Sequence, residues 1–573
     1  MVSPGIAMGR AFVYTEDRVT IPQYNISSGQ VAYEHDRFLA AVEKSAQEIL
    51  HLKDHSGSQM GETERKYLDS YLLMLKDPEL TSQVRDQLRV QKKNVEWALG
   101  QVIKKMTEKL DTLDDDYLRE RSVDIHDMAR RILRHLLHQK KVSLANLAEE
   151  VILVAHNLMP SDAISVNKSL VLAIAMDMGG KTSHTAILAR SFAIPAVLGL
   201  STISASAQTG DQLIVDGNEG IVIINPDKAT RKKYLSSREA WQRSELQLLD
   251  LSELQAETKD GKRLLLEANI EVPDEVGSVQ AHGADGIGLY RSEFLYILPN
   301  RFPTEEEQMA AYRRVLESMK PKSVTIRTLD LGGDKIIPGV RPGGEVNPIL
   351  GWRAVRFCLS RPDIFRIQLR ALLRASMYGN LKIMFPMISG IEELNQVMEI
   401  LEQVKDGLKA EGLAFKAEVP VGIMIEVPSA AFTSDILARY VNFFSIGTND
   451  LIQYTIAVDR ENERIAYLYE PFHLGVLRLI RLVIENAHRQ GIPVGMCGEM
   501  AGDPRATAIL LGLGLDEFSM SAIGIPGIKR IIRGTTVAEA EELAQTVLEM
   551  GSYQEIDVHV QEWMEKRFDF ISH

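Results

Sequence analysis

The chain has 573 residues, 45% of them hydrophobic and 25% charged, a composition typical of a globular protein with three or four folding units. Its formal net charge of −13 at pH 7 argues against non-specific nucleic-acid binding and leaves room for basic protein partners. Two cysteines exclude a disulfide framework, and the chain shows neither a bilayer-length apolar run nor a signal-peptide pattern, so we expect a cytoplasmic protein without membrane insertion.

The first part of the chain changes from strand-like to helical patterning. Residues 1–22 contain a short strand-rich lead, and residues 23–144 carry apolar residues at three- and four-residue spacing, which predicts a helical bundle. We expect its core to include Leu72, Leu73, Leu75, Val102, Ile103, Met106, Met128, Ile132, Leu133, Leu136 and Leu137. His135 and His138 share a helical face, but no third ligand is near in sequence, so we interpret them as a solvated surface pair.

Strand-like runs return over residues 145–226 and predict a compact α/β unit. The runs are residues 150–155, 170–174, 194–198, 212–217 and 220–226. The helical block therefore looks inserted between the first strand of this unit and the others. Residues 227–257 are charged and helix-forming, and we interpret them as a helical linker.

The last part, residues 258–573, alternates short apolar runs with helical patterns. The runs are residues 264–269, 286–290, 324–327, 381–385, 421–425, 443–446, 493–496 and 517–520. This number of strands over this length predicts a (β/α)8 TIM barrel. The predicted fold class is thus a multidomain α/β protein with an inserted helical bundle, a helical linker and a C-terminal barrel.

Polar residues stand at the carboxyl ends of most of these predicted strands. They are Arg291, Arg327 with Asp330, Glu426, Asn449 with Asp450, and Cys497 with Glu499. TIM-barrel active sites form at these ends, so the pattern predicts one shared site. Arginines bind phosphate and carboxylate oxygens, and two carboxylates are typical Mg²⁺ ligands. Taken singly, each residue could equally be a structural ion pair or a helix cap.

A glycine turn followed by a helix start lies at Met178–Thr185. Thr182 and Ser183 are natural N-cap residues, which places His184 in the first helical turn, where free N–H groups favour an anion. Neutral histidine can act as a nucleophile toward phosphorus. The alternative is a capped turn with a half-exposed histidine, and the local pattern alone favours that simpler interpretation.

Resemblance to a known family favours the nucleophile. Gly179–Arg190 closely resembles the phosphohistidine loop of the phosphoenolpyruvate-utilising enzymes. Gly288–Phe294, Ser445–Leu451 with Val458–Arg460, and Gly495–Gly502 are similar to segments of Enzyme I of the sugar phosphotransferase system, the phosphoenolpyruvate–protein phosphotransferases. This likeness covers nearly the whole chain.

The resemblance implies a role for each matching residue. His184 would be the phosphohistidine nucleophile and Cys497 the proton donor, with Glu426 and Asp450 holding Mg²⁺. Phosphoenolpyruvate would be bound by Arg291, Arg327, Asn449, Asp450 and Arg460. A thiol is largely protonated at neutral pH and can serve as an acid, although a free cysteine is more often a small buried hydrophobe, the interpretation kept for Cys358.

The same resemblance implies binding partners and a role for each domain. Residues 1–22 with 145–226 would form the phosphohistidine domain, residues 23–144 would bind the phosphocarrier protein HPr, and residues 258–573 would bind phosphoenolpyruvate and form a homodimer. The products would be pyruvate and phosphorylated HPr.

Four departures from the family pattern concern partner choice and rate. Lys181 stands where the family frequently has an arginine, Val346 where it usually has an acidic residue, and Tyr71 where it commonly has a histidine. The stretch Phe472–Gly475 replaces one that usually contains proline.

Three alternative functions remain. Pyruvate phosphate dikinase or phosphoenolpyruvate synthase needs an ATP-binding domain, for which no segment is found, and the nitrogen-regulatory Enzyme I usually has an extra N-terminal domain. The third is a silent phosphoenolpyruvate sensor, against which the joint presence of His184, Glu426, Asp450 and Cys497 argues.

Overall fold

The computed structural model describes residues 3, 5–14, 21–55, 68, 71–72, 74–111, 116–137, 147, 149–158, 170–179, 194–296, 301–332, 347–460, 462 and 464–568. His184, Lys181, His138 and Val346 lie outside these residues. The chain divides into two compact units, Met1–Glu245 and Leu246–His573. Each is described by itself.

A six-stranded mixed sheet in the first unit joins residues from both sides of the helical block. Its order is β4-β3-β2-β1-β5-β6. The strands are β1 (Ile6–Tyr14), β2 (Val151–Ala155), β3 (Val171–Met176), β4 (Ala196–Val197), β5 (Gln212–Asp216) and β6 (Ile221–Ile224). Strand β1 pairs parallel to β2, with Arg10 opposite Val151, and antiparallel to β5, with Ile6 opposite Asp216. The helical block is therefore an insertion, as the sequence predicts.

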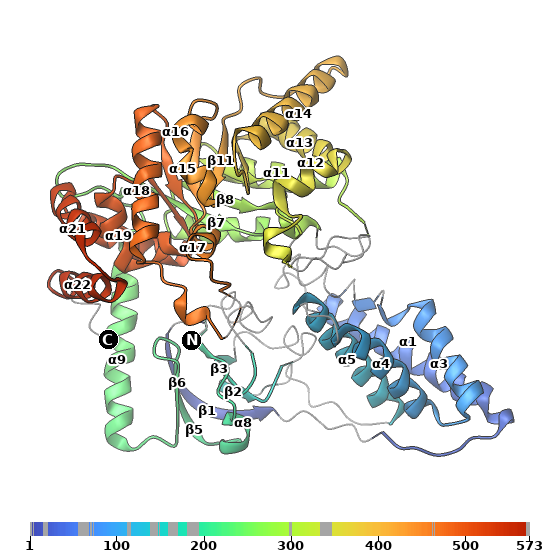
Figure 1. The fold of residues 1–573 in the computed structure, drawn as a ribbon. Coiled ribbons are helices and arrows are strands. Elements are labelled where there is room, and N and C mark those ends of the chain that lie inside the picture. The colour runs from blue at the N-terminus through green and yellow to red at the C-terminus, as the bar shows by residue number, and fades with distance from the viewer. Residues whose placement is uncertain are drawn as a thin grey trace. The chain divides into compact units, whose positions relative to one another are not determined.

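The inserted block is a bundle of helices, drawn in blue in Figure 1. The described helices are η1 (Ser28–Gln30), α1 (Val31–His55), α3 (Pro78–Gln91), α4 (Val95–Asp111) and α5 (Asp116–Leu136). Its core contains the predicted residues Leu75, Val102, Ile103, Met128, Ile132, Leu133 and Leu136. Tyr71, which the sequence comparison above singles out, is fully buried in this core. His135 Nε2 lies 3.1 Å from Glu48 Oε1 at the surface of the bundle.

Capping residues at both ends determine where helix α3 begins and ends. Pro78 stands in its first turn, and Asp77 caps it by accepting a hydrogen bond from the Glu79 N–H at 2.8 Å. The helix ends at Lys92, whose φ of 51° is left-handed and whose N–H donates to the Leu88 carbonyl.

The predicted linker is one helix, α9 (Lys228–Asp250).

The second unit is a closed barrel of eight parallel strands, and the (β/α)8 prediction is confirmed. The strands are β7 (Leu265–Ile270), β8 (Gly286–Arg291), β9 (Ser323–Arg327), β10 (Asn380–Phe385), β11 (Val421–Ile425), β12 (Phe443–Ile446), β13 (Val494–Met496) and β14 (Glu517–Met520). Strand β14 pairs with β7 and closes the ring. Each observed strand lies within two residues of its predicted bounds.

Helices surround the barrel strands in Figure 1. They are α10 (Val276–Ala281), α11 (Glu305–Met319), α12 (Ala354–Ser360), α13 (Pro362–Ala375), α14 (Ile391–Ala410), α15 (Pro428–Phe432), α16 (Ser434–Leu437), α17 (Thr448–Ile456), α18 (Leu474–Arg489), α19 (Pro504–Gly512), α20 (Ile525–Arg533), α21 (Val537–Glu549) and α22 (Tyr553–Glu565). Because helices cover the outer face, strands such as β11 and β12 are buried along their whole length.

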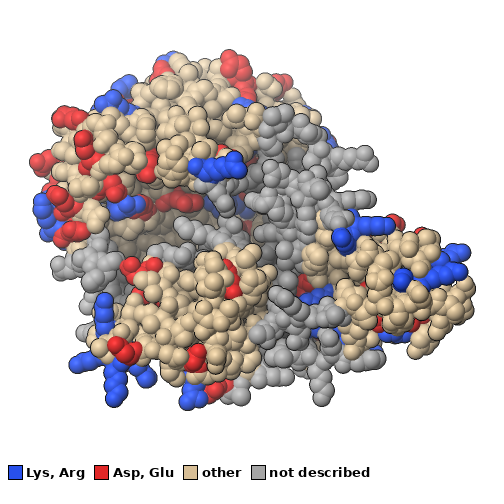
Figure 2. Space-filling model, turned by 60° about the horizontal axis from the view of Figure 1, so that its bottom comes forward, with Lys and Arg blue, Asp and Glu red and all other residues tan. Residues whose placement is uncertain are grey.

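The surface is mixed in charge. Figure 2 shows acidic and basic side chains interspersed over the visible face of the described residues. Such interspersion favours solubility over a single-sign field for nucleic acid. Within the described residues, none of the helices combines the length and the apolar character needed to cross a bilayer.

Candidate active site at the barrel mouth

Five barrel elements place the predicted site residues at one end. Arg291 and Arg327 are the last residues of β8 and β9, while Glu426 and Cys497 directly follow β11 and β13. Asn449 and Asp450 stand in the first turn of α17, one residue past the β12–α17 turn. Because all eight strands run parallel, their carboxyl ends open at the same mouth. The closed barrel therefore brings these strand ends to one side of the molecule.

Arg327 is a buried cation at this mouth. Its guanidinium lies 3.2 Å from Glu293 Oε2 and 3.2 Å from Asp330 Oδ2, and its side chain is only 8% exposed. Its buried Nε has no hydrogen-bond partner among the described residues. Although burial lowers the pKa of Arg327, the charges of Glu293 and Asp330 outweigh it and raise the pKa above the ordinary value. The side chain therefore stays charged.

Glu426 is a buried carboxyl crowded by other carboxylates. Burial, followed by repulsion from Asp450 and Asp330, raises the pKa of Glu426 to about 8. One carboxyl oxygen, Oε1, accepts the Met387 N–H at 2.6 Å. A Cβ on Gly447 would come within 2.9 Å of the other oxygen, so glycine is required where the β12–α17 turn passes this carboxyl.

The Glu426–Asp450 pair has the donor chemistry of a hard divalent cation. Two repelling carboxylates in a buried site are stabilised when a cation lies between them, and Mg²⁺ uses one or two carboxylates together with substrate phosphate and water. The two carboxylates therefore fit such a cation. Among the described residues, groups of three or more His, Cys, Asp or Glu suited to a metal are absent.

Cys497 lies at the base of the mouth in an apolar setting. It is 3% exposed and packs with Leu289, Met384, Met424 and Phe443. Burial raises the pKa of its thiol, against the opposing effects of the Ser445 hydroxyl and the Arg327 charge. Its Sγ points to the Ile446 carbonyl at 3.9 Å. The thiol is thus protonated at neutral pH, as an acid must be before it donates.

Asn449 and Arg460 stand nearer the rim. Asn449 Nδ2 donates to Glu499 Oε1 at 3.2 Å, and Asn449 Oδ1 accepts the Glu499 N–H at 2.9 Å, which locks the amide in one orientation. The Tyr469 hydroxyl donates to the Asn449 carbonyl at 3.2 Å. Burial raises the pKa of Tyr469 to about 12, and the positive charge of Arg460 opposes that rise. Arg460 is therefore close to Tyr469.

Arg291 stands on the opposite side of the rim from this group. It is held by a 2.6 Å ion pair with Glu271, which follows β7, and its side chain is 40% exposed. An exposed pair contributes little stability and is easily exchanged for a ligand anion. The fork of Arg291 is thus available to an incoming phosphate or carboxylate.

Comparison with known proteins settles the family. Three family models match the chain: the PEP-binding domain of the PEP-utilising enzymes over residues 246–537, their N-terminal domain over 1–121 and their mobile domain over 147–220. A phosphoenolpyruvate-protein phosphotransferase of Bacillus sp. (strain S) is 45% identical over 557 residues, covering 97% of this chain and 96% of that protein. The Bacillus subtilis (strain 168) protein of the same name is 44% identical over 560 residues, covering 98% of each. The chain belongs to the phosphoenolpyruvate–protein phosphotransferases.

For this phosphotransferase, the structure adds one residue that sequence reasoning missed. Arg353 donates from Nη2 to both oxygens of Asp330, at 3.1 and 3.0 Å, and to Asp450 Oδ2 at 3.0 Å. Along the sequence, Arg353 is far from the end of any strand and directly precedes α12. Its position in the sequence therefore does not predict that it belongs to the site. A bridge between Gly332 and Arg353 brings it to the mouth. Gly332 has a φ of +101°, and a Cβ there would meet the Trp352 carbonyl at 2.2 Å.

Proposed function

We propose that the chain transfers the phosphoryl group of phosphoenolpyruvate to its own His184 and then to a histidine of the phosphocarrier protein HPr, releasing pyruvate. The observation that carries this proposal is the convergence of Arg327, Glu426, Asp450 and Cys497 on one barrel mouth. The mouth combines arginine guanidinium groups that can bind anions, carboxylate oxygens that can bind a hard cation, and a protonated thiol. The reaction needs all three. Family membership supports the same reaction.

Phosphoenolpyruvate would be held by its charged groups. In the proposal Arg291, Arg327 and Arg460 bind phosphate and carboxylate oxygens, because guanidinium forks match such oxygens in pairs. The side-chain amide of Asn449, oriented by Glu499, supplies a further donor. Phosphoryl-transfer catalysis depends mainly on such positioning and charge neutralisation.

Glu426 and Asp450 would hold Mg²⁺. When bound, the cation would neutralise negative charge on the transferring phosphoryl group. The buried, mutually repelling carboxyls support this role. Glu426 stays in place because the Met387 N–H donates to it.

The chemical step follows from the residues proposed. The Nε2 or Nδ1 lone pair of His184 attacks phosphorus, a P–N bond forms, and the P–O bond to the enol oxygen breaks. The enolate then takes a proton on its methylene carbon from the Cys497 thiol. The resulting thiolate is reprotonated from solvent before the next cycle.

The proposed division of the chain follows the same scheme. Residues 1–22 and 145–226 carry His184, residues 23–144 bind HPr, residues 227–257 link the parts, and residues 258–573 bind phosphoenolpyruvate and form a homodimer. The proposed setting is the cytoplasm. Sedimentation equilibrium of the full chain, with and without phosphoenolpyruvate and Mg²⁺, tests the dimer.

Intact-mass spectrometry after mixing with phosphoenolpyruvate and Mg²⁺ tests the function. The wild type should gain one acid-labile phosphoryl group with release of one pyruvate, and His184→Ala should gain none. Adding HPr should then move the group to HPr and restore the original mass. If wild type stays unmodified while still binding phosphoenolpyruvate, the transferase proposal fails and the sensor alternative replaces it.

A further inference from the structure

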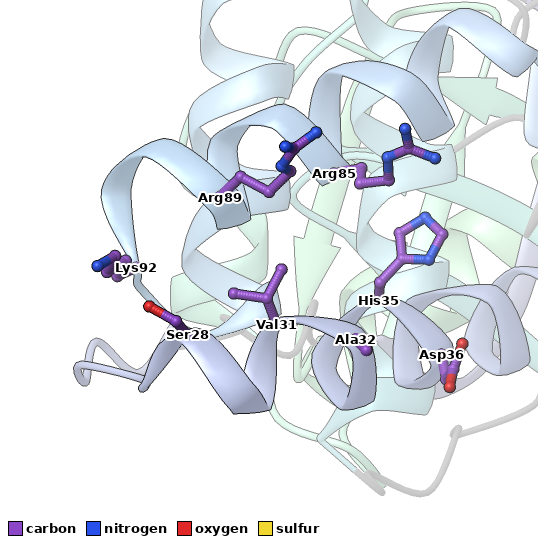
Figure 3. Close-up of a pocket in the computed structure, with 8 residues that line it drawn as sticks. All are labelled: Ser28, Val31, Ala32, His35, Asp36, Arg85, Arg89 and Lys92. Atoms are coloured by element: carbon purple, nitrogen blue, oxygen red, sulfur yellow. The ribbon is translucent and has the colours of Figure 1, made fainter.

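A cationic hollow lies in the helical bundle, in a part of the chain unrelated to the barrel mouth. It has a volume of about 580 Å³ and is lined by Ser28, Val31, Ala32, His35, Asp36, Arg85, Arg89 and Lys92 (Figure 3). Small-molecule sites typically measure roughly 300–1,000 Å³, so the volume of the hollow lies in the range of a small-molecule site.

The two arginines of the hollow share one face of α3. Arg85 and Arg89 are four residues apart, one helical turn, and both are exposed. Among the described residues neither guanidinium has an acidic partner, whereas barrel-helix arginines such as Arg313, Arg370 and Arg374 are paired with glutamates. Like charges at this spacing repel, so the pair carries a cost that an anion between the forks would remove.

His35 supplies a second and independent sign of a missing ligand. Its ring Nε2 is buried and has no hydrogen-bond partner among the described residues. In Figure 3 the ring points from α1 toward the side of the hollow where Arg85 lies. A buried polar atom without a partner is unfavourable unless something else binds it.

Helix stabilisation alone does not account for this cluster. Cations in the last turn of a helix interact favourably with its dipole, which explains Arg89 and Lys92 at the end of α3. Arg85 lies one turn earlier, and His35 belongs to a different helix, α1. Their convergence on the same hollow needs another explanation.

We propose that this hollow binds a phosphate monoester or free phosphate. Arg85, Arg89 and Lys92 outnumber the single carboxylate, Asp36, by two charges. A phosphate monoester carries about −1.5 to −2 charge at pH 7, which matches that excess. The guanidinium forks suit its oxygens, and His35 Nε2, when protonated, donates to one of them. The site is independent of the function proposed for the barrel.

Arginine modification of the full-length protein tests the site locally. Phenylglyoxal labelling, mapped by peptide mass spectrometry in phosphate-free buffer, reads Arg85 and Arg89 separately from the barrel arginines. At ten times the Kd, inorganic phosphate should slow labelling of both by about tenfold. Arg439, an exposed arginine of the barrel unit, should be unaffected. Equal protection by chloride at the same ionic strength, or no protection, overturns the proposal.

The same labelling experiment with two different ligands distinguishes a site for free phosphate from a site for an organic phosphate. Glycerol 3-phosphate is compared with inorganic phosphate, and glycerol serves as the uncharged control. Protection at lower concentrations of glycerol 3-phosphate identifies the site as one for phosphate monoesters, while stronger protection by inorganic phosphate identifies a free-phosphate site. Protection by glycerol alone would contradict both.

A matched pair of charge-removing variants gives the second measurement. Equilibrium dialysis with radiolabelled phosphate compares Arg85→Gln/Arg89→Gln with Lys44→Gln/Lys105→Gln, which removes the same charge from exposed positions of the bundle outside the hollow. The arginine variant should lose one bound phosphate per chain, and the lysine variant should keep it. Any phosphate bound at the barrel is common to both. Equal binding by the two variants would refute the site.

Discussion

Arg353 joins Asp450 at the mouth of the barrel, with Nη2 of the guanidinium 3.0 Å from Oδ2 of the carboxylate. The same nitrogen also contacts Asp330, so the side chain connects two acidic residues from different barrel segments. Its charge lowers the pKa of Glu426, partly offsetting the burial that raises it. Arg353 therefore sets both the position and the electrostatics of the proposed metal ligands.

Replacing Arg353 with lysine should reduce pyruvate release on the order of 10–100-fold. Lysine keeps the charge but loses the fork, and hydrogen bonds to charged groups are worth about 1.5–3 kcal/mol each. Steady-state pyruvate formation measures the effect. Arg356→Lys is the matched control, because Arg356 lies on the same segment, 35% exposed, and pairs with Glu393. Unchanged activity of Arg353→Lys would show that the fork is dispensable.

Replacing Cys497 with alanine should abolish protonation of the enolate at carbon. General acids typically contribute about 10²–10⁴-fold, and pyruvate formation should fall within that range. The direct readout is deuterium exchange of the pyruvate methyl group in D2O by NMR, which wild type should catalyse and Cys497→Ala should not. Cys358→Ala is the control, since Cys358 is buried and its thiol donates to the Leu329 carbonyl. Exchange at the wild-type rate in Cys497→Ala would assign the proton to another group.

Removing either proposed metal ligand should weaken Mg²⁺ binding strongly. Outer-sphere partners of a metal typically affect affinity about 10–100-fold, and direct ligands should exceed that. Titration calorimetry of Mg²⁺ with phosphoenolpyruvate present measures Glu426→Gln and Asp450→Asn. Glu393→Gln is the control, because Glu393 accepts from Ser389 and contacts Arg356. Wild-type affinity in both ligand variants would exclude this pair as the metal site.

A second buried carboxyl, inside the barrel, predicts a pH-dependent stability. Burial, followed by repulsion from Glu517, raises the pKa of Glu267 from 4.5 to about 7, while Lys382 and the Ser323 hydroxyl oppose the rise and Asp285 adds to it. As pH rises from 4.5 to 7, the unfolded chain releases the proton before the folded barrel does. The free energy of unfolding should therefore fall, on the order of 2–3 kcal/mol.

Glu267→Gln should remove this dependence. Calorimetric unfolding of the barrel transition at pH 5.5 and pH 8.5 measures it: the variant should gain stability relative to wild type at the higher pH. Glu542→Gln, an exposed substitution on α21, should follow wild type at both. Parallel pH profiles for wild type and Glu267→Gln would contradict the expectation.

The barrel and the inserted bundle could be predicted from the sequence because their signals are local. Apolar runs such as residues 421–425 are buried strands by composition alone, and the charged helical pattern near residue 240 continues through a single helix. Strand-end residues such as Arg327 and Glu426 could be found too, because parallel strands in a barrel open at one end.

The local sequence specifies the helices and strands and the polar residues at their ends. Which charged side chains meet depends on how these elements pack. Arg353 reaches Asp330 and Asp450 through a bridge at Gly332, a long-range contact without periodic signal. The hollow between α1 and α3 likewise depends on packing two helices separated along the chain. Local patterns set backbone conformation, whereas the distances between side chains, and hence their pKa values and ligand sites, arise only when the chain is folded.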